Sequence, residues 1–280
     1  MQAPLPDGAV LPDTGAMDLA AGDDATGAGE GEDAQETDAG EPAGEDASTD
    51  DPAPDSSGAP DSSLAQGLLV RYPLDLTPAT EVLDDSGSRA GAMHGGASWT
   101  DLGFPDARFP NGGALVLDGA SGLVTLPTAG LPGVAETKSV SLWFWQAAPS
   151  SSLRKTLLAL TNPDAGAGLQ LGLQGGVPSV WFWRQLIGTA IVAAPSQSRA
   201  GWTHLALIQD GTTCRLYVDG TLVDSSRALL PSRPVTSFML GGYAITGGED
   251  ELWRGRLDDV RLYGRALSSA EVSALANGAR

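Results

Sequence analysis

Residues 201–223 decide the fold, and they read GWTHLALIQDGTTCRLYVDGTLV. Apolar and polar side chains alternate through this stretch, which is the pattern of half-buried β-strands. Asp-Gly pairs at 210–211 and 219–220 interrupt the alternation. Such pairs favour the tight turns that join antiparallel strands, because these turns need positive φ. The stretch therefore predicts a three-stranded antiparallel meander.

The C-terminal end adds one strand and one helix. Residues 255–263 (GRLDDVRLY) read as a further strand, and residues 265–275 (RALSSAEVSAL) read as a short helix. Ser268 can cap the first turn of this helix, while Glu271, three places on, can reach back to the backbone N–H of the cap residue. An Asn-Gly pair directly after the helix suits its exit.

Together these segments resemble the laminin-G-like jelly roll of the concanavalin A-like lectin and glucanase superfamily. In that family a helix of the form LSxxEVxxL follows a DDVRLY strand, as it does here. The resemblance continues upstream in LVRYPLD (69–75), DDSG (84–87) and GALVLDG (113–119). It implies an all-β fold over residues 67–280, a two-sheet antiparallel jelly-roll sandwich with a short C-terminal helix.

The hydrophobic pattern of residues 67–280 agrees with an all-β fold. Short apolar runs are broken by Gly, Pro and Asp, and no helical period precedes the last dozen or so residues. Twelve strands fit two packed sheets. We expect them at 68–72, 114–117, 123–126, 140–147, 156–160, 169–173, 179–183, 202–209, 214–218, 222–224, 237–240 and 255–263.

The first 66 residues have a different composition. They hold 17 of the 35 acidic residues, seven prolines, no Lys or Arg, and no aromatic residue. Such a segment cannot bury enough apolar surface to offset the entropy of ordering. We therefore expect residues 1–66 to be a disordered acidic arm and residues 67–280 to form one domain, which with 18 acidic and 16 basic residues is close to neutral.

The composition also indicates which classes of partner are excluded and where the protein is located. An acidic arm on a neutral domain lacks the basic surface that nucleic acid requires. No segment approaches the roughly 20 apolar residues of a membrane span. Residues 1–6 (MQAPLP) lack the regions of a signal peptide. Either the protein stays inside the cell, or an upstream leader has been removed. Because the arm looks like the spacer of a bacterial surface protein, we favour the second alternative and expect an extracellular or cell-surface domain. A lipid anchor would require such an upstream segment.

Two tryptophan pairs are the candidate ligand-binding residues. On strands 140–147 and 179–183, the residues of one parity are apolar and belong in the core. The opposite parity places Trp143 and Trp145 on the non-core face of the first strand, and Trp181 and Trp183 on the non-core face of the second, in each case with Ser toward one end. Indole rings on the concave face of a jelly roll can stack against sugars, which predicts a partly wet, lectin-like face. The alternative is that these tryptophans are framework residues covered by loops.

Calcium is the candidate cofactor. Ca²⁺ takes six to eight oxygen ligands, and the resemblance implies a structural Ca²⁺ at the sandwich edge. The carboxylates expected to bind it are Asp84 and Asp85 in the DDSG loop, with Asp258 and Asp259 in the last strand. The alternative is that these residues hydrogen-bond local backbone donors at turns and strand ends.

The sequence gives less support for a catalytic function. The glucanases of this superfamily use a Glu-x-Asp-x-x-Glu strand that sets nucleophile and acid about 5 to 5.5 Å apart. That strand is absent from the sequence, where Glu249 and Glu251 flank Asp250 with the wrong spacing. His204 shares a strand face with Trp202 and Ala206, which favours a buried histidine over a general base.

The sequence therefore predicts a non-catalytic module that binds a glycan or another surface ligand. One alternative is an adhesion or scaffold domain that binds protein without recognising glycans. A second is a glycoside hydrolase or lyase with an atypical carboxylate pair, which requires two carboxylates facing each other in a cleft. Fold alone does not separate these functions.

Overall fold

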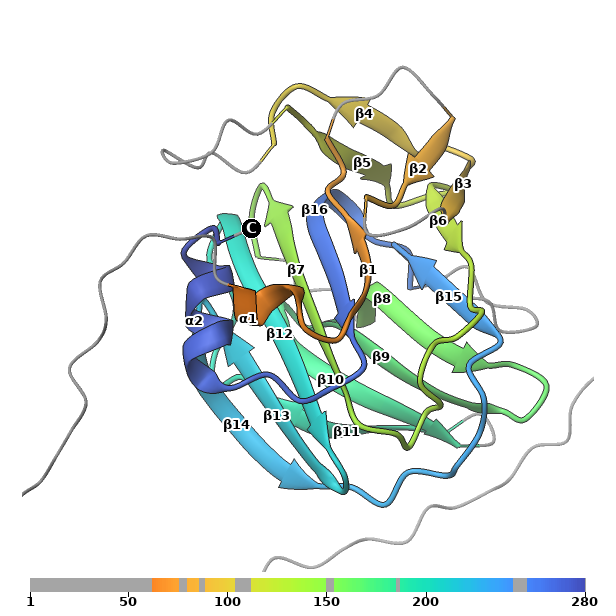
Figure 1. Ribbon diagram of the computed structural model, residues 1–280. Coiled ribbons are helices and arrows are strands. Elements are labelled where there is room, and N and C mark those ends of the chain that lie inside the picture. Colours follow the sequence, from red (N-terminus) through yellow and green to blue (C-terminus); the bar gives the residue numbers. More distant parts are fainter. Residues whose placement is uncertain are drawn as a thin grey trace, which may run out of the picture. The chain divides into compact units, whose positions relative to one another are not determined.

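The computed structural model describes residues 62–75, 80–85, 89–103, 112–149, 154–184, 187–243 and 251–279, all of which belong to one compact unit, Ser56–Arg280. Nearly all of the acidic segment lies outside these residues, so the arm and its boundary at residue 66 stay predictions. The described part is an all-β sandwich of two antiparallel sheets with a short C-terminal helix, as the sequence predicts (Figure 1).

The first sheet contains the meander. Its strands, in spatial order, are β14 (Thr221–Arg227), β13 (Thr213–Val218), β12 (Gly201–Asp210), β7 (Lys138–Gln146), β16 (Arg254–Tyr263), β5 (Ala114–Asp118) and β4 (Ser98–Thr100), and β1 (Leu68–Tyr72) pairs with the C-terminal half of β16. Gly211, Asp219 and Gly220 have positive φ at the two hairpin turns. The Asp-Gly pairs therefore act as the sequence predicts.

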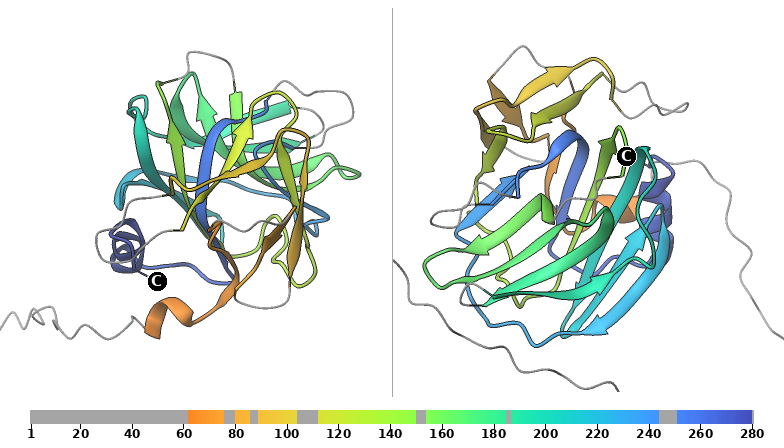
Figure 2. Two further views of the ribbon diagram at one scale, coloured as in Figure 1. Left: turned by 90° about the horizontal axis from the view of Figure 1, so that it is seen from above. Right: turned by 180° about the vertical axis from the view of Figure 1, so that it is seen from behind.

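The second sheet lies on the other side of the core (Figure 2). Its order is β11 (Ile187–Ala193), β10 (Val177–Arg184), β9 (Ala167–Gln174), β8 (Arg154–Asn162), β15 (Ser237–Leu240), β6 (Leu123–Leu126), β3 (Ala90–His94) and β2 (Glu81–Leu83). All twelve expected strands are present in the two sheets. β2, β3, β4 and β11 were not expected, because their runs are short or rich in Gly and Ala.

The core fills the space between the two sheets. β7 contributes Val140, Leu142 and Phe144, and β10 contributes Val180 with the partly buried Phe182, as their parity predicts. Each fully buried Leu or Phe contributes roughly 1.5 to 3 kcal/mol. The Phe144 ring meets that of Trp253 edge to face, with centroids 5.7 Å apart.

A second apolar cluster lies on the outer face of the first sheet. The helix α2 (Ser269–Ala276) packs Val272 and Leu275 against residues of β12, β13 and β16. Its N-terminus has the expected capping box, in which Ser268 and Glu271 satisfy each other's backbone N–H groups. Leu64, in the single-turn helix α1 (Ser62–Ala65), joins this cluster. One half of this outer face is therefore covered.

Candidate functional site

β7 carries four predicted residues along one outer face of the first sheet, and their burial falls from one end to the other. Ser139 and Ser141 are buried, Trp143 is 6 % exposed, and Trp145 is half-buried. All four point away from the core that Val140, Leu142 and Phe144 enter. Only the Trp145 end of this face is open.

The serine end is closed by the segment that leads into α2. The Ser139 hydroxyl donates to the Arg265 carbonyl at 2.8 Å and accepts from the Leu267 backbone N–H at 2.9 Å. The expectation of a partly wet face is therefore wrong at its serine end. Alternation along a strand reports which face a residue occupies, and it does not report whether a later segment covers that face.

Trp143 and His204 close the middle of the same face. Their rings are 5.2 Å apart, and His204 Nε2 lies 2.8 Å from Ser141 Oγ. Burial lowers the pKa of His204 to about 3, so the imidazole is neutral. No solvent reaches the ring. His204 is therefore a packed core histidine, in agreement with the interpretation preferred from the sequence.

The second tryptophan pair lies on the other sheet. Trp181 is fully buried, and its indole N–H donates to the Gln174 side chain at 3.0 Å. Trp183 is half-buried, and its ring stacks on Tyr243 with centroids 5.4 Å apart. The Arg154 guanidinium lies over both indoles, 5.6 and 5.2 Å from their centroids. The four tryptophans therefore occupy two different outer faces, so they cannot form one ligand platform.

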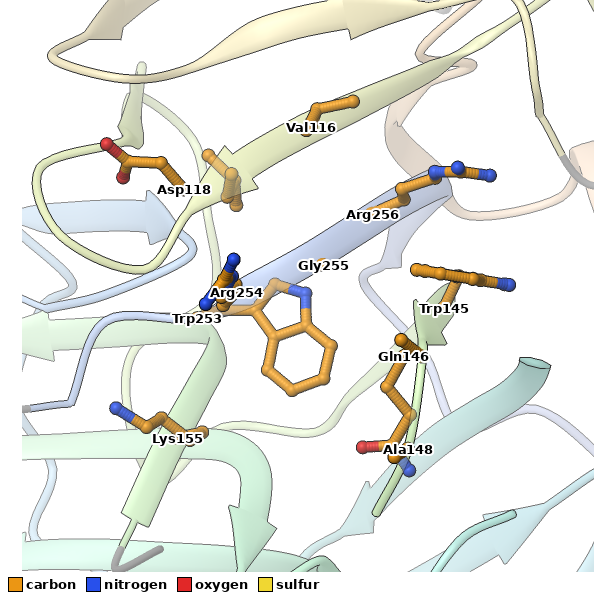
Figure 3. A pocket seen from close by; sticks show the side chains of 12 residues that line it. Val116, Asp118, Trp145, Gln146, Ala148, Lys155, Trp253, Arg254, Gly255 and Arg256 are labelled. Carbon is orange, nitrogen blue, oxygen red and sulfur yellow. The ribbon is translucent and has the colours of Figure 1, made fainter. Parts of the chain in front are cut away.

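A groove of about 710 Å³ opens beside Trp145. It lies where the ends of β5 and β7 meet the starts of β8 and β16, and Val116, Leu117, Ala147 and Ala148 give it apolar walls. Figure 3 shows the Trp253 indole between Lys155 and Arg254 on one side and Trp145 and Arg256 on the other. The groove combines aromatic surface with charged side chains, which is the composition of a polar-ligand site.

Trp145 and Arg256 form one unit in the groove wall. They are direct neighbours across β7 and β16, and the Arg256 guanidinium lies 4.3 Å from the centre of the indole. Its Nη1 also donates to the Leu102 carbonyl at 3.3 Å. A guanidinium held by a ring and a carbonyl keeps its remaining donors oriented before a ligand arrives.

Gly255 allows the groove to form between these side chains. A Cβ at this position would lie 2.3 Å from the Trp145 carbonyl oxygen and 2.7 Å from the Trp253 ring. Its φ of 156° also falls in the region that favours glycine. The sequence Arg254-Gly255-Arg256 therefore brings two cations and an indole close together.

Asp118 is the carboxylate among the described groove residues, and it is committed to a turn. Its Oδ1 accepts backbone N–H groups from Ala120, Ser121 and Gly122 at 2.7 to 2.9 Å. These bonds hold the pKa of Asp118 far below its usual range. A single ionised carboxylate of this kind does not supply the acid and base pair of a glycosidase. Of the acidic run considered above, Glu249 and Asp250 lie outside the described residues.

The sequence did not single out Lys155, Arg254, Arg256 or Trp253. Three of them stand on or beside β16, and Lys155 comes from β8, about a hundred residues earlier. The alternation of Arg254 and Arg256 across a glycine was the only local signal.

The four candidate calcium ligands lie near two arginines. Arg71 bonds Asp85 at 2.7 Å and Asp259 at 2.9 Å, while Arg261 bonds Asp259 at 2.8 Å. Burial raises the pKa of Asp259, but Arg261 and Arg71 outweigh it and hold that pKa below its ordinary value. Asp84 accepts the backbone N–H of Arg71, and buried Asp258 accepts that of Asp259.

This donor set does not fit Ca²⁺. Two guanidinium groups already pair with two of the four carboxylates, Asp85 and Asp259, and the described residues contain no group of three or more His, Cys, Asp or Glu that could hold a metal ion. The alternative from the sequence, hydrogen bonds to backbone donors, describes Asp84 and Asp258, whereas Asp85 and Asp259 form ion pairs that the sequence did not predict. Calcium binding itself stays a prediction.

Among the described helices, none has the length and apolar content needed to cross a bilayer.

Several solved structures have the same fold. Domain 4 of AbnA, an extracellular arabinanase from Geobacillus stearothermophilus solved in complex with arabinotriose, is 22 % identical with a TM-score of 0.57 over 75 % of this chain and 98 % of that domain. A structure of botulinum neurotoxin type C, a toxin that enters cells through interaction with two ganglioside molecules, is 13 % identical with a TM-score of 0.60 over 78 % of this chain. The binding domain of Paraclostridial Mosquitocidal Protein 1 is 16 % identical with a TM-score of 0.59 over 76 %.

This chain spans about half of each of the two toxin chains, 53 % and 52 %. At these identities the likeness establishes the fold alone. No curated protein sequence matches the chain. A family model, described as the concanavalin A-like lectin/glucanases superfamily, matches residues 118–273, which is more than half of the sequence. The chain therefore belongs to the laminin-G-like branch of the concanavalin A-like lectin and glucanase superfamily.

Proposed function

We propose that this protein is a non-catalytic carbohydrate-binding module of an extracellular or cell-surface protein, and that its ligand lies in the groove beside Trp145. The observation that carries the proposal is the groove itself. A half-buried indole, a guanidinium fixed on that indole and apolar walls line one space of about 710 Å³. Sugars offer C–H faces to aromatic rings and hydroxyls to charged groups, so this lining suits them.

The comparisons support the same class of ligand. The arabinanase domain was solved with an oligosaccharide, and the match covers 75 % of this chain. Botulinum neurotoxin type C interacts with gangliosides, which carry sugar headgroups. These ligands belong to those proteins, and they motivate the choice of glycans in the test below.

The two half-buried tryptophans provide a matched test. Full-length protein, Trp145→Ala and Trp183→Ala are compared for retention on a panel of polysaccharides, with thermal melting to verify folding. We expect Trp145→Ala to weaken binding about tenfold or more. Trp183→Ala, which removes an equal side chain on the other sheet, should change binding less than about twofold. Unchanged binding by Trp145→Ala would place the ligand elsewhere.

A protein-binding scaffold is the second candidate, because two of the four tryptophans are buried and Trp183 is stacked by its own neighbours. This function predicts no retention on any glycan. The hydrolase alternative predicts release of reducing sugar from a bound polysaccharide, and loss of that release in Asp118→Asn. We expect no release by the unmodified protein.

A further inference from the structure

The groove differs from the rest of the described domain in its charges. Three cations line it, Lys155, Arg254 and Arg256, against the single carboxylate of Asp118. The domain as a whole is almost neutral. Among the described residues that line this groove, positive charge therefore exceeds negative charge by two.

These three cations are also free to act on a ligand. Elsewhere, five arginines bond a carboxylate within 4 Å, namely Arg71, Arg199, Arg215, Arg261 and Arg265. No such ion pair links Lys155, Arg254 or Arg256 to a carboxylate of the residues that the structure describes. Asp118 lies opposite Arg254 in the register of β5 and β16, without an ion pair between them. Its Oδ1 already accepts hydrogen bonds from three backbone N–H groups. An anionic ligand would therefore compete with few carboxylates of the protein for these three cations.

The positions of the cations suit an anion attached to a sugar. Arg256 is fixed on the Trp145 ring and Arg254 stands two residues away along β16. Lys155 lies across the groove from Trp145 (Figure 3). The groove is also lined by the half-buried Trp145 indole and by aliphatic side chains, which suit the apolar face of a pyranose ring and are unsuited to a bare ion. Guanidinium groups bind carboxylate and sulfate oxygens through paired hydrogen bonds.

We infer that the groove binds acidic oligosaccharides, with Arg254, Arg256 and Lys155 receiving a carboxylate or sulfate group while Trp145 and its neighbours contact the sugar ring. This inference rests on the proposed function and adds the class of glycan. An acidic peptide is the rival occupant, and it lacks the sugar faces that the indole surface would meet. The test therefore compares ligands that carry uronate, sulfate or peptide carboxylate groups.

The test measures binding of the full-length protein to polygalacturonate, heparin, a sialylated oligosaccharide, neutral arabinan and polyglutamate at two salt concentrations. We expect at least one acidic glycan to bind about tenfold or more tightly than arabinan, and its affinity to fall with added salt. Lys155→Gln and Arg254→Gln should each weaken that binding about tenfold. Arg227→Gln, which removes an exposed cation at the far edge of the first sheet, is the matched control and should leave binding unchanged.

The outcomes separate this inference from the proposed function. Equal or tighter binding of arabinan, unaffected by Arg254→Gln, would overturn the acidic-sugar inference and leave carbohydrate binding intact. Binding of polyglutamate as tight as that of the best acidic glycan would also overturn it. Failure of every glycan to bind would overturn both. A preference for heparin over polygalacturonate, or the reverse, identifies the anion and supports the inference.

Discussion

The two ends of β7 carry a tryptophan each on the same outer face, but the side chains at one end are buried and the tryptophan at the other end is partly exposed. At one end Ser139 is bonded to the segment that leads into α2, while Ser141 and Trp143 contact His204 of the neighbouring strand β12. At the other end Trp145 stays half-buried beside a groove. The strand is regular throughout, so its own sequence does not cause the difference. Contacts with segments far away in the sequence, His204 for Trp143 and the stretch before α2 for Ser139, separate the closed end of the strand from the end that can meet a ligand.

The largest difference between the two ends should appear in stability. Trp143→Ala removes a ring that is 6 % exposed and packed on His204, so we expect the free energy of unfolding to fall by about 3 to 5 kcal/mol. Trp145→Ala removes a half-buried ring with one cation contact, so we expect a loss of about 1 kcal/mol or less. Urea denaturation measures both. Equal losses would break the comparison.

The covered end should also make stability depend on pH. The pKa of His204 is about 3 in the folded protein and near 6.5 when unfolded, so the unfolded chain binds more protons in acid. Stability should therefore fall as pH drops below about 6.5, by roughly 2 kcal/mol at pH 5, and level off near pH 3.

The check is urea denaturation of the unmodified protein and His204→Gln between pH 7.5 and 5. The variant lacks the titrating ring, so the pH-dependent part of the difference between the two proteins reports His204 alone. Parallel curves would show that the pKa of the ring is the same in the folded and unfolded states, which would contradict its burial.

Ser139 provides a smaller test of the same coverage. Ser139→Ala leaves the buried Leu267 N–H without its acceptor, so we expect a loss of about 1 to 2 kcal/mol. Ser273→Ala on the outer side of α2 is the matched control and should stay within about 0.5 kcal/mol. If both variants matched the unmodified protein, the segment before α2 would not seal this end.

The smallest expected effect concerns calcium. Because Arg71 and Arg261 neutralise Asp85 and Asp259, we expect millimolar CaCl₂ or EDTA to shift the melting temperature by less than about 1 °C. The calcium hypothesis from the sequence predicts stabilisation by Ca²⁺ instead. A rise of several degrees with Ca²⁺, lost in Asp85→Asn, would restore that hypothesis.

The sequence predicts the local features of this molecule and misses those that depend on distant segments. The Asp-Gly turns, the Ser268 capping box and the inward parity of Val140, Leu142 and Phe144 all depend on neighbouring residues. The partners of Ser139 and the meeting of Lys155 with Arg256 depend on how strands far apart in sequence are placed. Parity placed all four tryptophans on outer faces, and only the sheet order shows that these faces differ.

The most direct test of carbohydrate binding at the open end of β7 is a nitrogen-15 NMR titration of the seven indole N–H signals, each assigned through a Trp→Phe variant. Addition of a glycan retained by the protein should shift the Trp145 signal most, with Trp253 next, and leave Trp181 and Trp183 in place. Shifts confined to Trp181 and Trp183 would move the ligand to the other sheet and contradict the account.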